Sequence, residues 1–231
     1  MSARCVILVP ANGPIEPGCE DALRELEKRG YPVRRVRGYS QVDVARNQMA
    51  ADAVADGFDE LMWVDSDVVF NPDDVDRLRG HTEPFVCGLY AKKGRREFAC
   101  AFLPGTETLK FGRDGALHEI LYAGFGFVLT RREVFERTHT ELELPVCNAR
   151  FGRGLVPWFQ PLAVPDAGGH WYLGEDYAFC ERARRCGFRV MADTAVRLWH
   201  VGSYRYGWEE AGADPARFDD YAYHLRPPTD R

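Results

Sequence analysis

Two aspartates stand two residues apart, directly after a run of apolar residues. The stretch LMWVDSDVVFNPDD, residues 61–74, places Asp65 and Asp67 where a buried strand would end. Side chains alternate along a strand, so both carboxylates would point to one side and could approach one cation. Mg²⁺ and Mn²⁺ are commonly held by one or two carboxylates together with the phosphates of a nucleotide. An acidic turn that caps the next helix explains this pair, taken alone, equally well.

A second pair of carboxylates begins the segment GEDYAFCERARRCGF, residues 174–188. Its apolar spacing predicts a helix, and it places Asp176 at the inward edge of the first turn. A carboxylate there could accept a proton from a hydroxyl group. Taken alone, Glu175 and Asp176 are better explained as acidic residues placed favourably at a helix N-terminus.

Two further features could take part in chemistry. Gly124 and Gly126 in AGFGF lie at the entry to an expected strand, where missing side chains permit close approach of a ligand. A bulge would need the same glycines. His200 ends the strand-like AVRLWH, and imidazole is a frequent metal ligand. A lone histidine is more often a rim or core residue.

The first half of the chain alternates strand and helix patterns. Apolar runs predict strands at residues 5–9, 33–37 and 60–64, and helices are expected at 19–30, 40–57 and 71–80. In the second of these helices, Ser40 and Asp43 have capping-box spacing, and Val42, Ala45, Met49 and Ala53 form the expected buried stripe. This order predicts an α/β fold with a Rossmann-like, doubly wound mixed sheet flanked by helices. Ligands of such sheets bind beyond the carboxyl ends of the strands, where Asp65 and Asp67 would lie.

The second half is less regular. Strands are expected at 84–90 and 97–103, and a strand leading into a helix at 121–137. Residues 145–173 are rich in proline, glycine and aromatic residues, which predicts a long surface loop of the kind that carries function. Nothing in the pattern marks a boundary between two folding units, so a single domain is expected.

Composition narrows the class of protein. The 231 residues carry a formal charge of −5, which gives no basic footprint for a nucleic-acid partner, although KKGRR at 92–96 is a local cationic cluster. Seven cysteines occur without a CxxC pair, which disfavours a disulfide framework or a structural zinc module and indicates reduced thiols. The chain has no run of about 20 apolar residues that could cross a bilayer. We therefore expect a cytoplasmic protein without a transmembrane segment.

Taken together, four elements resemble the shared core of nucleotide-sugar glycosyltransferases of the A-type (GT-A) fold, and of their family 2 in particular. They are Asp65-Ser66-Asp67, Gly124-Phe125-Gly126, Gly174-Glu175-Asp176 and His200. VPANG near the start and ARNQMA at 45–50 are also similar to the nucleotide-binding half of those enzymes. The resemblance implies a domain over residues 1–202, with a nucleotide-binding half to about 105 and an acceptor half from about 106. The tail at 203–231 departs from the shared core, and its tyrosine and tryptophan content predicts that it docks on the domain or closes over the donor.

The resemblance also implies roles for the donor and metal site. Asp65 would hydrogen-bond the ribose or sugar of the donor, while Asp67 and His200, with Asp65 nearby, would bind Mn²⁺ or Mg²⁺ that bridges the diphosphate. The other donor-binding residues it implies are Pro10, Asn12, Arg46, Ser66, Lys92, Gly124 and Gly126. For Lys92, and for Lys93 beside it, an ordinary solvated turn is the simpler explanation.

The same resemblance assigns the catalytic residues, and the aromatic loop just before them predicts the acceptor site. Asp176 would be the general base of an inverting transfer, with Glu175 orienting the acceptor. Trp158, Trp171 and Tyr172 would form an acceptor wall, because aromatic faces suit the apolar face of a sugar or an aglycone. A hydrophobic flap over the core would use the same aromatic residues. The acceptor itself stays open, since a glycan, a lipid-linked sugar, a protein or a small molecule would fit equally well.

The sequence thus predicts a metal-dependent glycosyltransferase that moves a sugar from a nucleoside-diphosphate-sugar donor to a hydroxyl acceptor. Two alternatives remain. A sugar-1-phosphate nucleotidyltransferase would usually carry a basic GxGxR loop where this chain has Ala11-Asn12-Gly13-Pro14. A non-catalytic, degenerate GT-A fold that binds sugar nucleotides would keep the same elements without turnover.

Overall fold

The computed structural model describes residues 3–211 and 221–224 of the chain. Its centre is a seven-stranded mixed sheet in the order β2-β1-β3-β10-β5-β13-β8. The parallel set contains β2 (Val33–Val36), β1 (Cys5–Pro10), β3 (Glu60–Val64), β5 (Phe85–Cys87) and β13 (Val190–Asp193). The strands β10 (Phe127–Arg131) and β8 (Leu117–Ile120) run antiparallel to their neighbours.

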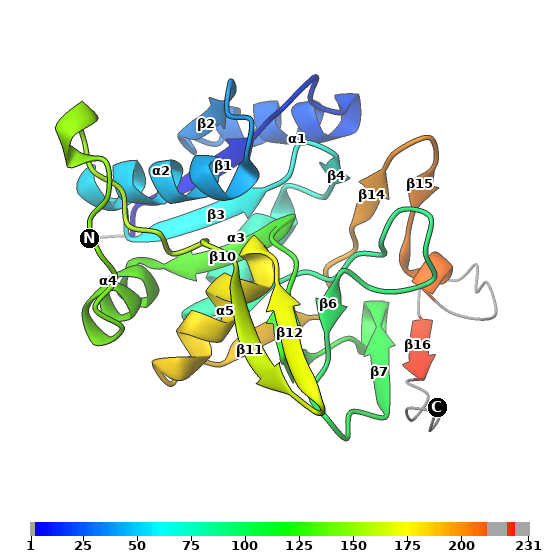
Figure 1. The fold of residues 1–231 in the computed structure, drawn as a ribbon. Coiled ribbons are helices and arrows are strands. Elements are labelled where there is room, and N and C mark those ends of the chain that lie inside the picture. The colour runs from blue at the N-terminus through cyan, green and yellow to red at the C-terminus, as the bar shows by residue number, and fades with distance from the viewer. Residues whose placement is uncertain (1–2, 212–220, 225–231) are drawn as a thin grey trace.

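Helices cover both faces of this sheet (Figure 1). The helices α2 (Val42–Ala55), α4 (Arg132–Glu141) and α5 (Glu175–Arg185) contribute side chains to one hydrophobic cluster, and α1 (Pro17–Lys28) and α3 (Asp73–Arg79) contribute to the other. Alternate residues of β3 divide between the clusters: Leu61 and Trp63 enter the first, Met62 and Val64 the second. The predicted α/β, doubly wound, single-domain fold is confirmed.

The start of α2 differs from the predicted cap. Gln41, not Ser40, is the residue before the first turn, and it makes no side-chain capping bond. Ala45, Met49 and Ala53 are buried as expected, but Val42 is 41% exposed. Helical side chains lean toward the helix N-terminus, so a side chain on the first residue points past the end of the helix.

The region expected to be a long loop contains a hairpin. Its strands are β11 (Leu162–Asp166) and β12 (Gly169–Leu173), with Val164 opposite Trp171. This hairpin, yellow in Figure 1, lies beside α5 and is separate from the central sheet. Before it, the short 3-10 helix η2 (Ala149–Phe151) is tied to α2 by Arg153, whose guanidinium bonds Asp56 at 3.0 Å. The prediction of a long surface loop therefore did not include this hairpin, which forms its second half.

Small strand pairs surround the end of β3. The strand β14 (Trp199–Val201) pairs with β4 (Val68–Val69) and with β15 (Arg205–Tyr206), and this pairing sets His200 opposite Val68. The strand β6 (Cys100–Ala101) pairs with β9 (Tyr122–Ala123).

Parts of the segment after residue 202 lie against the body of the domain. The strand β16 (Tyr221–His224) pairs with β7 (Thr108–Phe111), which precedes the 3-10 helix η1 (Gly112–Asp114). Trp208 of the 3-10 helix η3 (Trp208–Ala211) is buried against Phe111, with ring centroids 5.0 Å apart. Residues 212–220 and 225–231 of the tail lie outside the described residues.

All seven cysteines are free thiols. Within the described ranges, none of the helices has the length and apolar character needed to span a bilayer.

Candidate functional site

A cavity of about 380 Å³ lies at the carboxyl end of β3. The strand stops at Val64 because the chain turns there: the amide of Asp65 donates to the carbonyl of Gly126, and the amide of Val68 donates back to the carbonyl of Asp65. We call this space the central cavity. It is lined by Asp65, Tyr90, Lys92, Ala99, Gly124, Trp171, Tyr172, Gly174, Glu175, Asp176, Tyr177 and His200.

Arg46, from the first turns of α2, connects two carboxylates of this cavity. Its side chain is only 2% exposed, its Nη2 lies 3.0 Å from Oδ1 of Asp65, and its Nε lies 3.4 Å from Oδ1 of Asp176. Burial lowers the pKa of the guanidinium, but the two carboxylates raise it above its ordinary value overall. The cation stays charged and neutralises the aspartate at the end of β3. A carboxylate at the end of a buried strand needs a neutralising partner, and for Asp65 that partner is Arg46.

Asp176 lies at the start of α5 and faces the cavity. Its Oδ2 accepts a hydrogen bond of 3.0 Å from the backbone amide of Phe125, and its Oδ1 has no hydrogen-bond partner among the described residues. Burial raises the pKa of Asp176 to about 7, although Arg46 lowers it. A carboxylate with this pKa has the strength of a general base near neutral pH. Its side chain lines the central cavity, while the Oδ1 atom itself is buried and lies against Arg46.

Tyr90 explains the two glycines of AGFGF and was not anticipated from the sequence. Its hydroxyl accepts a 3.0 Å hydrogen bond from the amide of Gly126. A Cβ at Gly126 would lie 2.6 Å from that hydroxyl, and one at Gly124 would lie 2.7 Å from it and 2.6 Å from the carbonyl of Ala99. The missing side chains therefore make room for Tyr90, while Gly124 also lines the central cavity. The sequence pattern could not predict the contact between Tyr90 and the two glycines, because that contact depends on how β5 and β10 pair.

Asp67 binds different partners from Asp65. The pairing of β14 with β4 places His200 beside it, with Nε2 of His200 3.6 Å from Oδ1 of Asp67. The ammonium of Lys93 contacts the other carboxylate oxygen, Oδ2. Burial raises the pKa of Asp67, but its interactions with His200 and Lys93 lower it to about 2 overall. Asp67 is therefore a carboxylate at any physiological pH.

The predicted metal set is brought together only in part. Oδ1 of Asp65 bonds the guanidinium of Arg46, whereas Asp67 contacts Lys93 and His200, so the two aspartates have different partners in this structure. Across residues 3–211 and 221–224, no three His, Cys, Asp or Glu side chains gather closely enough to hold a metal ion.

Asp67 and His200 nevertheless fit a cation as a pair. Nδ1 of His200 lies 3.0 Å from the carbonyl of Ala91, which can only accept, so Nδ1 carries the proton. In the neutral ring, Nε2 then presents a lone pair toward a carboxylate oxygen 3.6 Å away. Two facing acceptors at this separation suit a metal bound at about 2.1 Å from each, and a backbone carbonyl that fixes the tautomer is the usual support.

Aromatic side chains from the hairpin form one wall of the central cavity. The ring of Trp171 lies 5.4 Å from that of Tyr122 and 6.0 Å from that of Tyr177, and Tyr172 is 70% exposed. Trp158 does not share this position. It is 4% exposed and packs against Phe135 in the core, where its indole N–H donates to a backbone carbonyl. The expectation that Trp158 contacts an acceptor is corrected accordingly.

The remaining predicted donor residues lie nearby but not together. Asn12 lines a second cavity, of about 560 Å³, at the carboxyl ends of β1 and β2, with Arg37 opposite. Pro10 is buried at the end of β1, and Ser66 uses its carbonyl to fix the amide of Glu16 at the start of α1. Lys92 lines the central cavity, although its ammonium lies 3.0 Å from Glu97.

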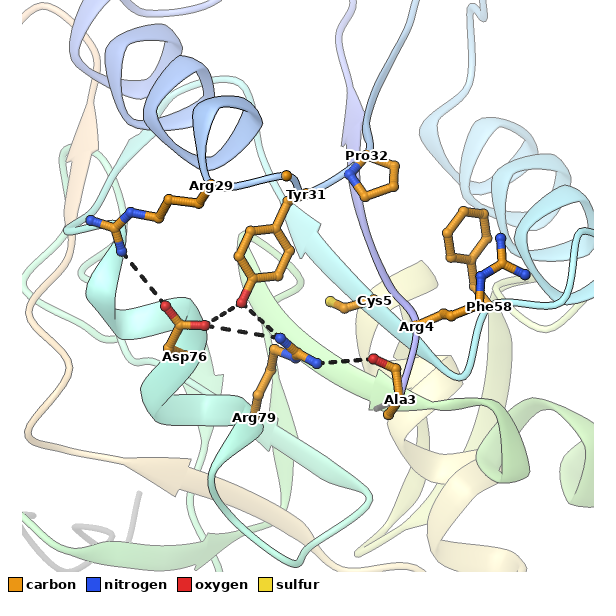
Figure 2. Close-up of a pocket in the computed structure, with 10 residues that line it drawn as sticks. Ala3, Arg4, Cys5, Arg29, Tyr31, Pro32, Phe58, Asp76 and Arg79 are labelled. Atoms are coloured by element: carbon orange, nitrogen blue, oxygen red, sulfur yellow. Dashed lines mark hydrogen bonds and ion pairs between the residues drawn. The ribbon is translucent and has the colours of Figure 1, made fainter. Parts of the chain in front are cut away.

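A third cavity, of about 490 Å³, lies at the opposite, amino ends of β1, β2 and β3. Figure 2 shows Arg79 of α3 reaching between Tyr31 and the carbonyl of Ala3, with Asp76 bonded to Tyr31 and close to Arg29. Arg29 and Arg79 are both paired with Asp76, and the guanidinium of Arg4 bonds backbone carbonyls. The carboxyl-end cavities, with the Asp176 carboxyl group and the Asp67–His200 pair, are the better candidates for chemistry.

Comparison with known proteins identifies a solved structure that shares this fold. No family model matches the chain, and no curated protein matches it in sequence. Among solved structures it is similar to A197 from STIV, with a TM-score of 0.59, 17% identity, and coverage of 99% of this chain and 97% of that one. This likeness establishes a shared fold.

Weaker structural likenesses include two enzymes of sugar-nucleotide chemistry. One is GalNAc-T7 with UDP, GalNAc and Mn²⁺ (TM-score 0.47, 10% identity, 90% of this chain and 47% of that one). The other is CMP:2-keto-3-deoxy-manno-octonic acid synthetase complexed with CTP (TM-score 0.39, 12% identity, 82% of this chain and 89% of that one). Likenesses of this extent do not bear on function, which we argue from the site itself.

Proposed function

We propose that this protein is a glycosyltransferase that moves a sugar from a nucleoside-diphosphate-sugar donor to a hydroxyl group of an acceptor. The observation that carries the proposal is Asp176. Its carboxyl group has a pKa raised to about 7 and lines the same cavity as Asp65 and His200. A displacement at a sugar carbon requires a base and a group that stabilises the leaving diphosphate, and the Asp67–His200 pair beside this cavity would supply the second through a bound cation.

The donor would lie along the carboxyl ends of the strands. Its nucleoside would occupy the second cavity beside Asn12, and Asp65 would accept a hydrogen bond from a ribose or sugar hydroxyl. The diphosphate would then reach Asp67, His200 and the lysines of the 92–96 segment. Asp67 and His200 would hold Mn²⁺ or Mg²⁺ there. When bound, the cation supplies Lewis-acid stabilisation of the charge that develops on the leaving diphosphate.

The chain's own residues would carry out the transfer as an inverting displacement. The acceptor hydroxyl, resting against Trp171 and Tyr172 and oriented by Glu175, gives its proton to the carboxylate of Asp176. Its oxygen bonds the sugar C1 as the bond from C1 to the diphosphate oxygen breaks on the opposite face. Arg46 favours the ionised form of Asp176 before the transfer and holds the carboxyl group in place, because its buried guanidinium is fixed between Asp176 and Asp65.

The proposal is tested by incubating purified protein with UDP-, GDP-, dTDP- and CMP-sugars and Mn²⁺, and by following release of the nucleotide with and without candidate acceptors. Release of a nucleotide from one donor class that is lost in Asp176→Asn supports glycosyl transfer. Release of pyrophosphate from a nucleoside triphosphate and a sugar 1-phosphate would instead show a nucleotidyltransferase. Donor binding without turnover would show a sugar-nucleotide-binding protein.

A further inference from the structure

The contact between Lys93 and Asp67 has a consequence for the proposed metal site. Lys93 lies in the loop of residues 92–97 that follows β5, and an isolated bridge between Ala91 and Phe98 closes the base of this loop. The ammonium of Lys93 bonds Oδ2 of Asp67, while His200 faces Oδ1 of the same carboxylate. Asp67 is thus bound by an internal cation, the ammonium of Lys93, and it is also one of the two residues proposed to bind a divalent ion.

The position of Lys93 is built into the surrounding chain. A Cβ at Gly202 would lie 3.1 Å from Cδ of Lys93, so a residue without a side chain follows β14 where the lysine's methylene groups pass. The same strand carries His200, whose Nδ1 bonds the carbonyl of Ala91 two residues before Lys93. The loop and β14 are therefore tied together, and Lys93 is held within reach of Asp67.

We propose that Lys93 is an internal competitor of the divalent cation for Asp67. The inference rests on the proposed function only in taking Asp67 and His200 as the metal ligands. With Lys93 in place, a divalent ion must share Asp67 with an ammonium of the same sign, which weakens its binding. A diphosphate offers Lys93 anionic oxygens in exchange for Asp67. Metal and diphosphate therefore favour each other's binding, and this coupling is reciprocal by thermodynamic necessity.

The test is Mn²⁺ binding alone, measured from the loss of the electron paramagnetic resonance signal of free Mn²⁺ during titration of the protein. Lys93→Met is expected to bind Mn²⁺ at least about tenfold more tightly than the wild type, which corresponds to about 1.4 kcal/mol. Lys93→Arg, which keeps the charge and the reach, should bind like the wild type. Asp67→Asn should abolish binding in either background.

Lys92→Met is the matched control. It removes the same charge from the adjacent position, but its ammonium bonds Glu97 rather than Asp67. A gain in Mn²⁺ affinity confined to Lys93→Met supports competition at Asp67. Equal affinities of Lys93→Met and the wild type overturn it, and so do equal gains in both lysine variants, which would reflect a general charge effect. Absence of Mn²⁺ binding in every variant overturns both the competition and the metal site, but it leaves donor binding to be judged separately.

Discussion

The Nε of Arg46 lies 3.4 Å from Oδ1 of Asp176, inside a domain where the arginine side chain is almost wholly buried. The other end of the guanidinium bonds Asp65, so the residue expected to hold the donor and the residue expected to act as base share one fixed cation. This arrangement leads to the following predictions.

Replacing Asp176 with Asn should remove glycosyl transfer and leave donor binding intact. The amide cannot accept the acceptor's proton, and losing a general base lowers kcat by about 100-fold to 10,000-fold. Steady-state kinetics together with donor titration by calorimetry measure the two effects. Asp166→Asn, an exposed change on β11 of the hairpin, is the matched control and should alter neither quantity. A full rate in Asp176→Asn would remove this residue from the mechanism.

The rate should depend on the protonation of Asp176. A base works only when it has lost its proton, and the pKa of this carboxyl is raised to about 7, chiefly by burial. We expect kcat/KM to be level above about pH 7 and to fall about tenfold for each pH unit below it. A rate that stays level down to pH 5 would contradict the assignment, since Asp176 is protonated there.

Removing the charge of Arg46 should move this pH profile upward. The guanidinium lowers the pKa of Asp176, so in Arg46→Gln the carboxyl should ionise at a higher pH than in the wild type. Arg46→Lys keeps the charge and should keep the midpoint near its original place. Comparing the midpoints of the three pH–rate profiles distinguishes this electrostatic role from a loss of folding, which would reduce the rate equally at every pH.

Gly126→Ala should destabilise the fold. A Cβ there would lie 2.6 to 2.9 Å from atoms of the Tyr90 side chain, and Tyr90 is buried and cannot move aside freely. Overpacking of this kind costs about 1–3 kcal/mol. Gly169→Ala is the control, because a Cβ there meets nothing within 4 Å. Urea denaturation of both variants measures the difference in stability. Equal midpoints would show that Tyr90 and its neighbours shift to make room for the added methyl group at little cost.

Local sequence patterns predicted most of what positions the site. The apolar runs gave β1 and β3, the helical spacing gave α5, and the end of β3 placed Asp65 at the carboxyl edge of the sheet. These features depend on periodicities of a few residues, which a single segment carries by itself.

Contacts between distant segments could not be predicted in the same way. The bond from Arg46 to Asp65 spans 19 residues, and the packing of Tyr90 against Gly126 spans 36. Trp158 and Trp171 are both tryptophans of the same aromatic-rich segment. Trp158 nevertheless lies in the core, whereas Trp171 lies at the cavity because it belongs to the β11–β12 hairpin. Which of two similar residues reaches a site is decided by tertiary packing.

The most direct test of the proposed function is a thermal-shift screen of the purified protein with UDP-, GDP-, dTDP- and CMP-sugars, each with Mn²⁺ and with EDTA. A ligand at about 100 times its Kd stabilises the native state by about 2.7 kcal/mol, which is a measurable rise in Tm. We predict a rise for one nucleotide class that disappears with EDTA and in Asp67→Ala. The absence of a rise with any of these donors would contradict a nucleotide-sugar site at the carboxyl edge of this sheet.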